Sequence, residues 1–166
     1  LFIHAISDIE RIGDHALNIA ESAMDMHKNH FSLSGEAKHE IKVLRHLMED
    51  VIAAAFEAFK SNDIALAKRV EPMEEVMDSL SAKLKERNVR RMQEHSCAVQ
   101  AGILYLDIIN DFERICDHCS NLAIYVAQSD HDVYAVHEYS DSIKKDNLEF
   151  KRYYTELLDQ YEQKLS

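Results

Sequence analysis

Apolar side chains recur every three to four residues along nearly the whole chain, which is the spacing of amphipathic helices. The predicted helices span residues 1–29, 35–60, 63–94, 97–128 and 147–164, with a short helix or turn near 133–139. Only short polar links separate the first four of these helices. Short links between long helices favour an all-α, elongated, antiparallel bundle.

Three local features refine this prediction. Ser34 is placed to cap the N-terminus of the second helix. Pro72 lies inside the third pattern and predicts a kink or a break at Val70 or Glu71, because proline lacks the N–H that a helix interior needs. One apolar stripe on the first helix is expected to be buried, and it consists of Phe2, Ile6, Ile9, Gly13, Ala16, Ala20 and Ala23.

The composition supports an all-helical fold, and the net charge restricts the classes of molecule that the chain is expected to bind. The chain holds three glycines and one proline among 166 residues, too few for the turns of an all-β or βαβ fold. Nineteen basic and thirty acidic residues give a net charge of -11, which argues against nucleic-acid binding and favours cations or a basic protein partner. No apolar run is long enough to span a bilayer by itself. Three cysteines, an odd number, favour a reducing compartment.

The chain contains an internal repeat. Residues 8–20, DIERIGDHALNIA, align without gaps on residues 111–123, DFERICDHCSNLA, with identical residues in eight of thirteen positions. Most of the identities are polar, so a shared need for burial does not explain them. A duplicated helical unit is the simplest account.

Each copy places a row of oxygen-bearing side chains along one helix face, at spacings of three or four residues. The rows are Glu10, Asp14, Asn18 and Glu21 in the first copy, Glu113, Asp117 and Asn121 in the second, and the pair Glu74 and Asp78 on the third predicted helix. Carboxylates at i and i+4 lie about 6 Å apart and repel each other unless a positive charge lies between them. That charge is either a metal ion or the neighbouring Arg11 or Arg114. Antiparallel packing of the third and fourth helices would bring four carboxylates together, a set that suits iron, manganese, zinc or magnesium.

For the other polar residues, structural roles are favoured over catalytic, redox or metal-binding roles. Cys116 and Cys119 have CxxC spacing but lie in mid-helix, which favours core packing over redox or zinc chemistry. His15 and His118 lie beside the acidic rows, where interhelical hydrogen bonding is favoured over metal ligation. No nucleophile stands at a recognisable spacing from a base, so no catalytic residue is expected.

The strings around residues 8–21 and 112–123 resemble the paired signature of the PhoU family. Its members are all-helical regulators of phosphate homeostasis built from two three-helix repeats, and the resemblance covers about residues 1–128. It implies E/DxxxD motifs that hold iron or other metal clusters on the surface. The implied metal ligands are Glu10, Asp14, Glu74, Asp78, Glu113 and Asp117, with Asn18, Glu21, Asn121, His15 and His118 as secondary polar or metal-binding groups.

The chain departs from the family pattern in several places. The first repeat has its motif helix but lacks the two helices that should precede it. Pro72 interrupts the helix that carries Glu74, and Ile124 stands where the first copy has Glu21. About forty residues follow the second motif, more than a free-standing PhoU protein needs.

Together with a first residue, Leu1, that lies inside a helical pattern, these departures predict a piece of a longer protein. In these respects the chain resembles the C-terminal PhoU-like domain of a bacterial sodium/phosphate cotransporter-family protein. That resemblance implies a PhoU-like domain over residues 1–128, with motif helices 1–29 and 97–128. The helical spacing of Phe150, Tyr154, Leu157 and Tyr161 predicts that a helical extension over residues 129–166 packs on the bundle.

The resemblance therefore implies a non-enzymatic regulatory domain in phosphate transport, on the cytoplasmic side of the bacterial inner membrane. Its expected partner is the membrane transporter portion of the same polypeptide or another transport or signalling protein, with a homodimer left open. Iron is the metal implied by the resemblance, with zinc, manganese and magnesium as alternatives. A second hypothesis is a structural interaction module whose acidic rows pair with arginines and hold no metal. A metal-dependent enzyme is least favoured, because the rows lie on convex helix faces.

Overall fold

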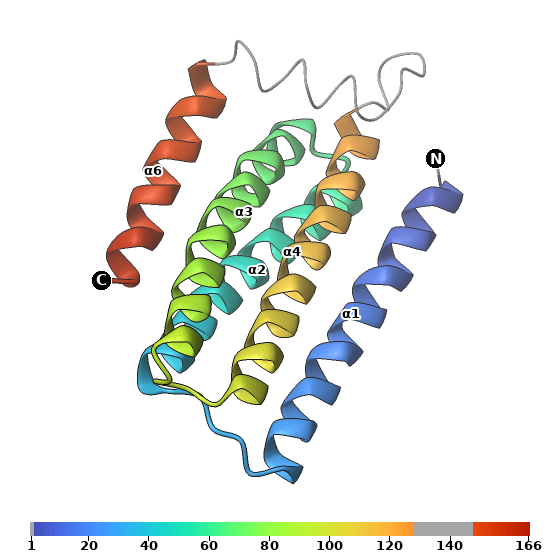
Figure 1. Cartoon of the computed structure of the whole chain (residues 1–166). Coiled ribbons are helices and arrows are strands. Elements are labelled where there is room, and N and C mark those ends of the chain that lie inside the picture. The colour runs from blue at the N-terminus through green and yellow to red at the C-terminus, as the bar shows by residue number, and fades with distance from the viewer. Residues whose placement is uncertain (1, 128–147) are drawn as a thin grey trace.

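The computed structural model describes residues 2–127 and 148–166, and these residues form five helices and no strand. The helices are α1 (Phe2–Lys28), α2 (Gly35–Ser61), α3 (Ile64–Gln93), α4 (Val99–Ala127) and α6 (Leu148–Lys164). Helices α1 to α4 alternate in direction along the chain (Figure 1). The predicted all-α antiparallel bundle is confirmed. The helix or turn expected near 133–139, and the first part of the extension over 129–166, lie outside the described residues.

Helices α2, α3 and α4 form the central bundle, with α1 packed on α4 and α6 packed on α3 (Figure 1). Each central helix contributes large, fully buried apolar side chains, among them Leu44, Leu47, Met77, Leu80, Leu84, Ile109, Ile115 and Leu122. Burial of such side chains is the main favourable contribution to folding. No helix in the described part of the chain is both long enough and apolar enough to cross a membrane.

The helix ends follow local capping signals. The Ala37 N–H donates to Ser34 Oγ at 3.1 Å, which confirms Ser34 as the cap of α2. Asn62 ends α2 in a left-handed conformation with φ of 53°, and Asp63 caps α3 by accepting from the Leu66 N–H at 3.0 Å. Two tight caps therefore turn the chain within two residues.

Of the kink or break predicted at Val70 or Glu71, the break does not occur. Helix α3 continues through Pro72 from Ile64 to Gln93. Proline removes one backbone hydrogen bond from the helix interior. Its buried neighbours Val70 and Met73 pack into the central core and supply the favourable contacts that hold the helix together across this gap.

The face of α1 that contacts α4 is not the predicted stripe. Ile6 is 63% exposed and Ile9 is 38% exposed. The other exposed members of that stripe are Gly13, Ala16, Ala20 and Ala23. Ala5 and Asp8 are buried instead, and Ile12, Ile19 and Met26 pack against the core. The expectation was wrong because polar groups, described below, select the face of α1 that meets α4.

Candidate functional site

The structure brings three of the predicted metal ligands together. Glu74 and Asp78 are one turn apart on α3, and Asp117 lies on the antiparallel α4. Their carboxylate oxygens all lie within 4.8 Å of one another. Glu74 is buried, Asp117 is half-buried and Asp78 is exposed, so this acidic cluster opens to solvent on one side. Three oxygen donors at this spacing form a partial ligand set for a hard divalent cation.

The fourth predicted ligand of this group, Glu113, is paired with a lysine. Lys85 Nζ donates to Glu113 Oε2. Lys85 lies two helical turns after Asp78 on the same face of α3, so its ammonium group pairs with a carboxylate whose charge also contributes to raising the pKa of Asp78. Glu113 does not belong to the group formed by Glu74, Asp78 and Asp117, so the structure does not bring it together with the other three predicted ligands.

The electrostatics of the acidic cluster are those of crowded carboxylates. Partial burial, followed by the charges of Asp117, Glu113 and Glu75, raises the pKa of Asp78 from 3.8 to about 6, while a hydrogen bond with Glu74 acts in the opposite direction. A cation between these carboxylates would remove the repulsion that raises the pKa. Asp117 also accepts a hydrogen bond from its neighbour Arg114 at 3.3 Å. Both side chains of this pair are open to solvent, so the pair contributes little to stability.

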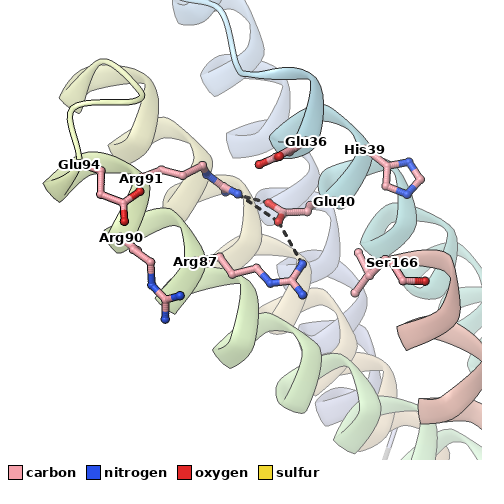
Figure 2. Close-up of a pocket in the computed structure, with 9 residues that line it drawn as sticks. Glu36, His39, Glu40, Arg87, Arg90, Arg91, Glu94 and Ser166 are labelled. Atoms are coloured by element: carbon pink, nitrogen blue, oxygen red, sulfur yellow. Dashed lines mark hydrogen bonds and ion pairs between the residues drawn. The ribbon is translucent and has the colours of Figure 1, made fainter.

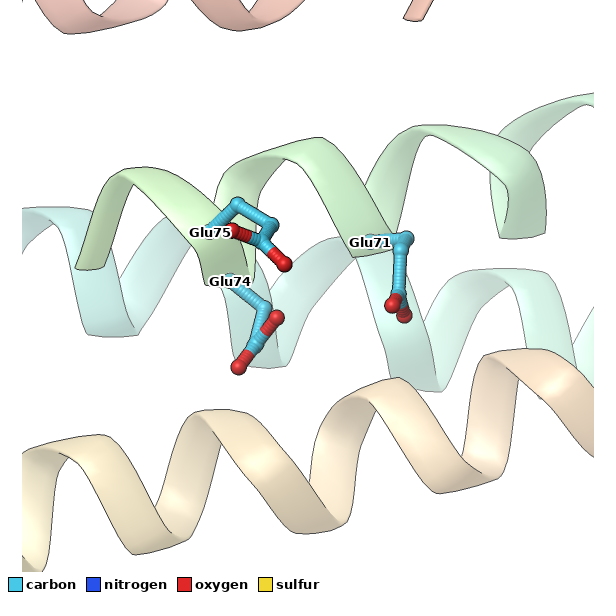
Figure 3. Close-up of side chains that lie close together, drawn as sticks. All are labelled: Glu71, Glu74 and Glu75. Atoms are coloured by element: carbon cyan, nitrogen blue, oxygen red, sulfur yellow. The ribbon is translucent and has the colours of Figure 1, made fainter. Parts of the chain in front are cut away.

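A second acidic group adjoins the cluster along α3. Glu71 and Glu75 have carboxylate oxygens within 4.8 Å of that of Glu74. Figure 3 shows Glu71 and Glu74 directed from α3 toward α4, with Glu75 beside them. The Ser120 hydroxyl on α4 donates to the buried Glu71. Glu71 and Glu75 were not among the predicted ligands, although their spacing of three and four residues in the run EPMEE places them on one helix face.

The predicted ligands on α1 lie apart from this cluster. Glu10 and Asp14 are exposed, and neither belongs to a group of three potential ligands among the described residues. Asp14 is paired with Arg11 at 3.6 Å. Because α4 contacts a different face of α1, no described helix brings a second acidic pair to this row.

The repeated aspartate, histidine and asparagine join α1 to α4. His15 Nδ1 lies 2.7 Å from Asp111 Oδ1, and in the reciprocal pair His118 Nδ1 lies 2.7 Å from Asp8 Oδ1. The two imidazole rings stack with their centroids 5.7 Å apart. In each pair the carboxylate comes from one copy of the repeat and the imidazole from the other copy. An approximate two-fold axis therefore relates the two copies. The predicted interhelical role of the two histidines is what the structure shows.

The asparagines complete this arrangement. Asn18 donates to Asp111 at 3.3 Å and Asn121 donates to Asp8 at 3.2 Å. The structure therefore places the secondary groups Asn18, Asn121, His15 and His118 in the α1–α4 contact and not at the acidic cluster. Glu21 lines a shallow groove of about 410 Å³ beside this contact, together with the acidic residues Asp25, Asp107 and Asp111.

The CxxC cysteines are buried in the core. Burial, and then the charge of Asp8, raises the pKa of the Cys119 thiol to about 12. The pKa of Cys116 is also raised well above its usual range, mainly by burial. Neither thiol is the low-pKa, accessible group that redox catalysis requires. These positions serve close helix packing, as their spacing in mid-helix predicted.

Comparison with known proteins gives the family of this sequence. The family model of the PhoU domain matches residues 41–126. A phosphate-specific transport system accessory protein, PhoU homolog 1 of Thermotoga maritima, is 32% identical over 116 residues, which is 70% of this chain and 49% of that protein. The PhoU homolog of Streptococcus pneumoniae is 26% identical over 117 residues, which is 70% of this chain and 52% of that protein. The chain thus spans about half the length of the curated relatives it matches. No solved structure matches it.

Proposed function

The chain belongs to the PhoU domain family, and from that premise we propose that it is a regulatory accessory domain in phosphate transport and homeostasis. The relatives that it matches are named phosphate-specific transport system accessory proteins. The matched segment, residues 41–126, contains most of the central bundle and the whole acidic cluster. In this proposal the domain acts by binding a cation and a protein partner, and it catalyses no reaction.

The finer proposal concerns its location and partner. We propose a PhoU-like domain of a bacterial sodium/phosphate cotransporter-family protein, on the cytoplasmic side of the inner membrane, in contact with the transporter portion of the same polypeptide. Two observations support this. Helix α6 packs on α3 beyond the segment matched by the family, and the thiols of Cys97, Cys116 and Cys119 are free, as is typical of a reducing compartment.

The genomic sequence that encodes the residues before Leu1 tests this location. We expect several long apolar spans upstream. Two amphipathic helices in that place, without any apolar span, would contradict the proposal and indicate a free-standing regulator.

We also propose that the acidic cluster binds a divalent cation through Glu74, Asp78 and Asp117. The single observation that supports this is the convergence of three carboxylates from two helices within 4.8 Å. Oxygen-only ligands suit magnesium and manganese, and carboxylate-rich sites also hold iron. When bound, the cation would neutralise the cluster and tie α3 to α4.

Metal analysis and thermal unfolding test this assignment. Wild-type protein should bind Mn²⁺ or Fe²⁺, and its free energy of unfolding should rise by about 2.7 kcal/mol at a free metal concentration one hundred times the Kd. The double variant Asp78→Asn with Asp117→Asn should lose both effects. The variant Glu10→Gln with Asp14→Asn is the matched control from the other copy of the repeat, and it should keep them. Equal metal content in wild type and in the Asp78/Asp117 variant would contradict the assignment.

Specific contacts favour a second candidate function, a structural interaction module without metal. Lys85 neutralises Glu113, and arginines pair with Asp14 and Asp117. In this case the acidic rows contribute to solubility and partner contacts only. Millimolar Mn²⁺ or Fe²⁺ would then leave the unfolding temperature of the wild-type protein unchanged, whereas the metal-binding function predicts an increase.

A further inference from the structure

A pocket of about 680 Å³ lies at the end of the bundle where α2 begins and α3 ends (Figure 2). The last two turns of α3 contribute Arg87, Arg90 and Arg91, and the first two turns of α2 contribute Glu36 and Glu40. Three guanidinium groups thus gather in one pocket of a chain whose net charge is -11. The pocket shares no residue with the acidic cluster on α3 and α4.

Glu40 and Arg91 form the base of the pocket. Glu40 is only 4% exposed, and its two carboxylate oxygens accept hydrogen bonds from Arg91 at 3.1 and 2.8 Å. The Tyr105 hydroxyl donates to Glu40 at 2.6 Å, and burial followed by this hydrogen bond raises the pKa of Tyr105 above its usual range. The hydroxyl therefore stays protonated and remains a donor. Because Glu40 is saturated by these donors, its charge is compensated inside the protein.

Arg87 and Arg90 keep most of their donors available to a ligand. Arg87 approaches Glu40 only at 3.5 Å, and Arg90 approaches Glu86 at 3.5 Å. The side chains of these arginines are 40% and 64% exposed, and Figure 2 shows both on the α3 wall of the pocket. Two guanidinium forks three residues apart on one helix match the several oxygens of a phosphate group better than the two oxygens of a carboxylate. The N-terminal end of α2 adds partial positive charge.

The remaining acidic groups of the pocket suit hydroxyl groups. Glu36 and Glu94 line the pocket and are exposed. Ionised carboxylates only accept hydrogen bonds, so they pair with sugar hydroxyls and disfavour a bare anion. A volume of about 680 Å³ lies in the range of small-molecule sites and leaves room for a sugar beside a phosphate. We propose that this pocket binds a phosphorylated sugar compound, with its phosphate on Arg87 and Arg90 and its hydroxyls on Glu36 and Glu94.

Isothermal titration calorimetry of the 166-residue chain with ribose 5-phosphate at low ionic strength tests the proposal. We expect binding of ribose 5-phosphate, weaker binding of inorganic phosphate and no binding of ribose. The double variant Arg87→Gln with Arg90→Gln should weaken the binding of ribose 5-phosphate by about tenfold or more. Arg45→Gln is the matched control, because Arg45 is exposed on α2 and pairs with Glu49 one turn away, outside the pocket. It should leave the affinity unchanged.

A second variant distinguishes the carboxylates proposed to bind the sugar hydroxyls from the arginines proposed to bind the phosphate. Glu94→Gln removes a strong hydroxyl acceptor, so it should weaken the binding of ribose 5-phosphate and leave the binding of inorganic phosphate unchanged or stronger. Arg87, Arg90 and Glu94 all lie at the surface, so the variants should fold, as circular dichroism will verify. Absence of ribose 5-phosphate binding to the wild type, or equal affinity of the wild type and the double arginine variant, would overturn the proposal.

Discussion

At the scale of single residues, the two copies of the repeat use the same groups with different partners. Asp8 accepts hydrogen bonds from His118 and Asn121, and also from the Tyr125 hydroxyl at 3.0 Å. Its counterpart Asp111 accepts from His15 and Asn18, and serine stands at residue 22, the position equivalent to Tyr125. The approximate symmetry of the α1–α4 contact is therefore broken by one tyrosine.

This asymmetry predicts unequal costs of removing the two aspartates. Asp8→Ala leaves three donors without this acceptor in a buried contact and should lower the free energy of unfolding by about 3 kcal/mol, whereas Asp111→Ala should cost about 2 kcal/mol. Urea unfolding measures both. Asp14→Ala, an exposed aspartate of the same repeat, should stay within about 0.5 kcal/mol of wild type. Equal costs at Asp8 and Asp111 would show that the Tyr125 hydrogen bond adds nothing.

The raised pKa of Asp78 predicts a pH dependence of stability in metal-free protein. The carboxyl group has a pKa of about 6 in the folded state against an ordinary pKa of 3.8, so the folded chain binds this proton more tightly than the unfolded chain does. The resulting penalty is absent below about pH 4 and complete above about pH 6. Asp78→Asn should therefore raise stability at pH 7, by about 1 kcal/mol because solvent screens this exposed group. The gain should vanish as the pH falls through this window.

Thermal unfolding of both proteins between pH 4 and pH 7 measures that difference. Comparing the variant with the wild type at each pH cancels the titration of the other groups. If the stability difference between Asp78→Asn and the wild type is constant with pH, or grows as the pH falls, the raised pKa of Asp78 is not its cause.

At the scale of helices, capping signals in the sequence predicted helix ends, whereas Pro72 did not break α3 and the buried face of α1 was assigned wrongly. Ser34 and the boundary between the predicted helices 35–60 and 63–94 agree with the observed helix ends to within one residue, because caps depend on neighbouring residues only. The convergence of Glu74 and Asp78 with Asp117 followed from antiparallel packing alone. The Lys85–Glu113 pair and the buried face of α1 depend on the register between helices, which periodicity does not contain.

Two glycines in repeated helices give a prediction at this scale. A Cβ atom added to Gly102 on α4 would lie 2.4 Å from Met92 Sδ and 2.7 Å from Met92 Cγ on α3, so the flexible Met92 side chain must move and Gly102→Ala should destabilise the protein by up to about 1 kcal/mol. A Cβ atom on Gly13 of α1 meets nothing within 4 Å, so Gly13→Ala should stabilise it by about 0.5–1 kcal/mol through helix propensity. Thermal unfolding that gives both substitutions the same sign would contradict these placements.

At the scale of the whole molecule, the approximate two-fold axis leaves α1 and α4 in unequal surroundings. On α4, Ile109, Phe112 and Cys116 are buried in the central bundle. The equivalent positions of α1, 103 residues earlier, are Ile6, Ile9 and Gly13, and the side chains of both isoleucines are exposed. The apolar stripe found in the sequence is thus a real surface feature of α1, although the described helices do not cover it.

Because no described helix covers this apolar face, copies of the 166-residue chain should associate through α1. Ile6 and Leu17 are 63% and 59% exposed, so Ile6→Lys with Leu17→Lys should leave the unfolding temperature nearly unchanged and yield a monomer at concentrations where the wild type forms dimers. Sedimentation velocity measures this. Val89→Lys is the matched control, because Val89 is 40% exposed on α3, whose main contacts are with α2, α4 and α6, and it should leave dimers intact. A wild-type chain that stays monomeric at high concentration, or a Val89 variant that dissociates equally, would exclude α1 as the interface.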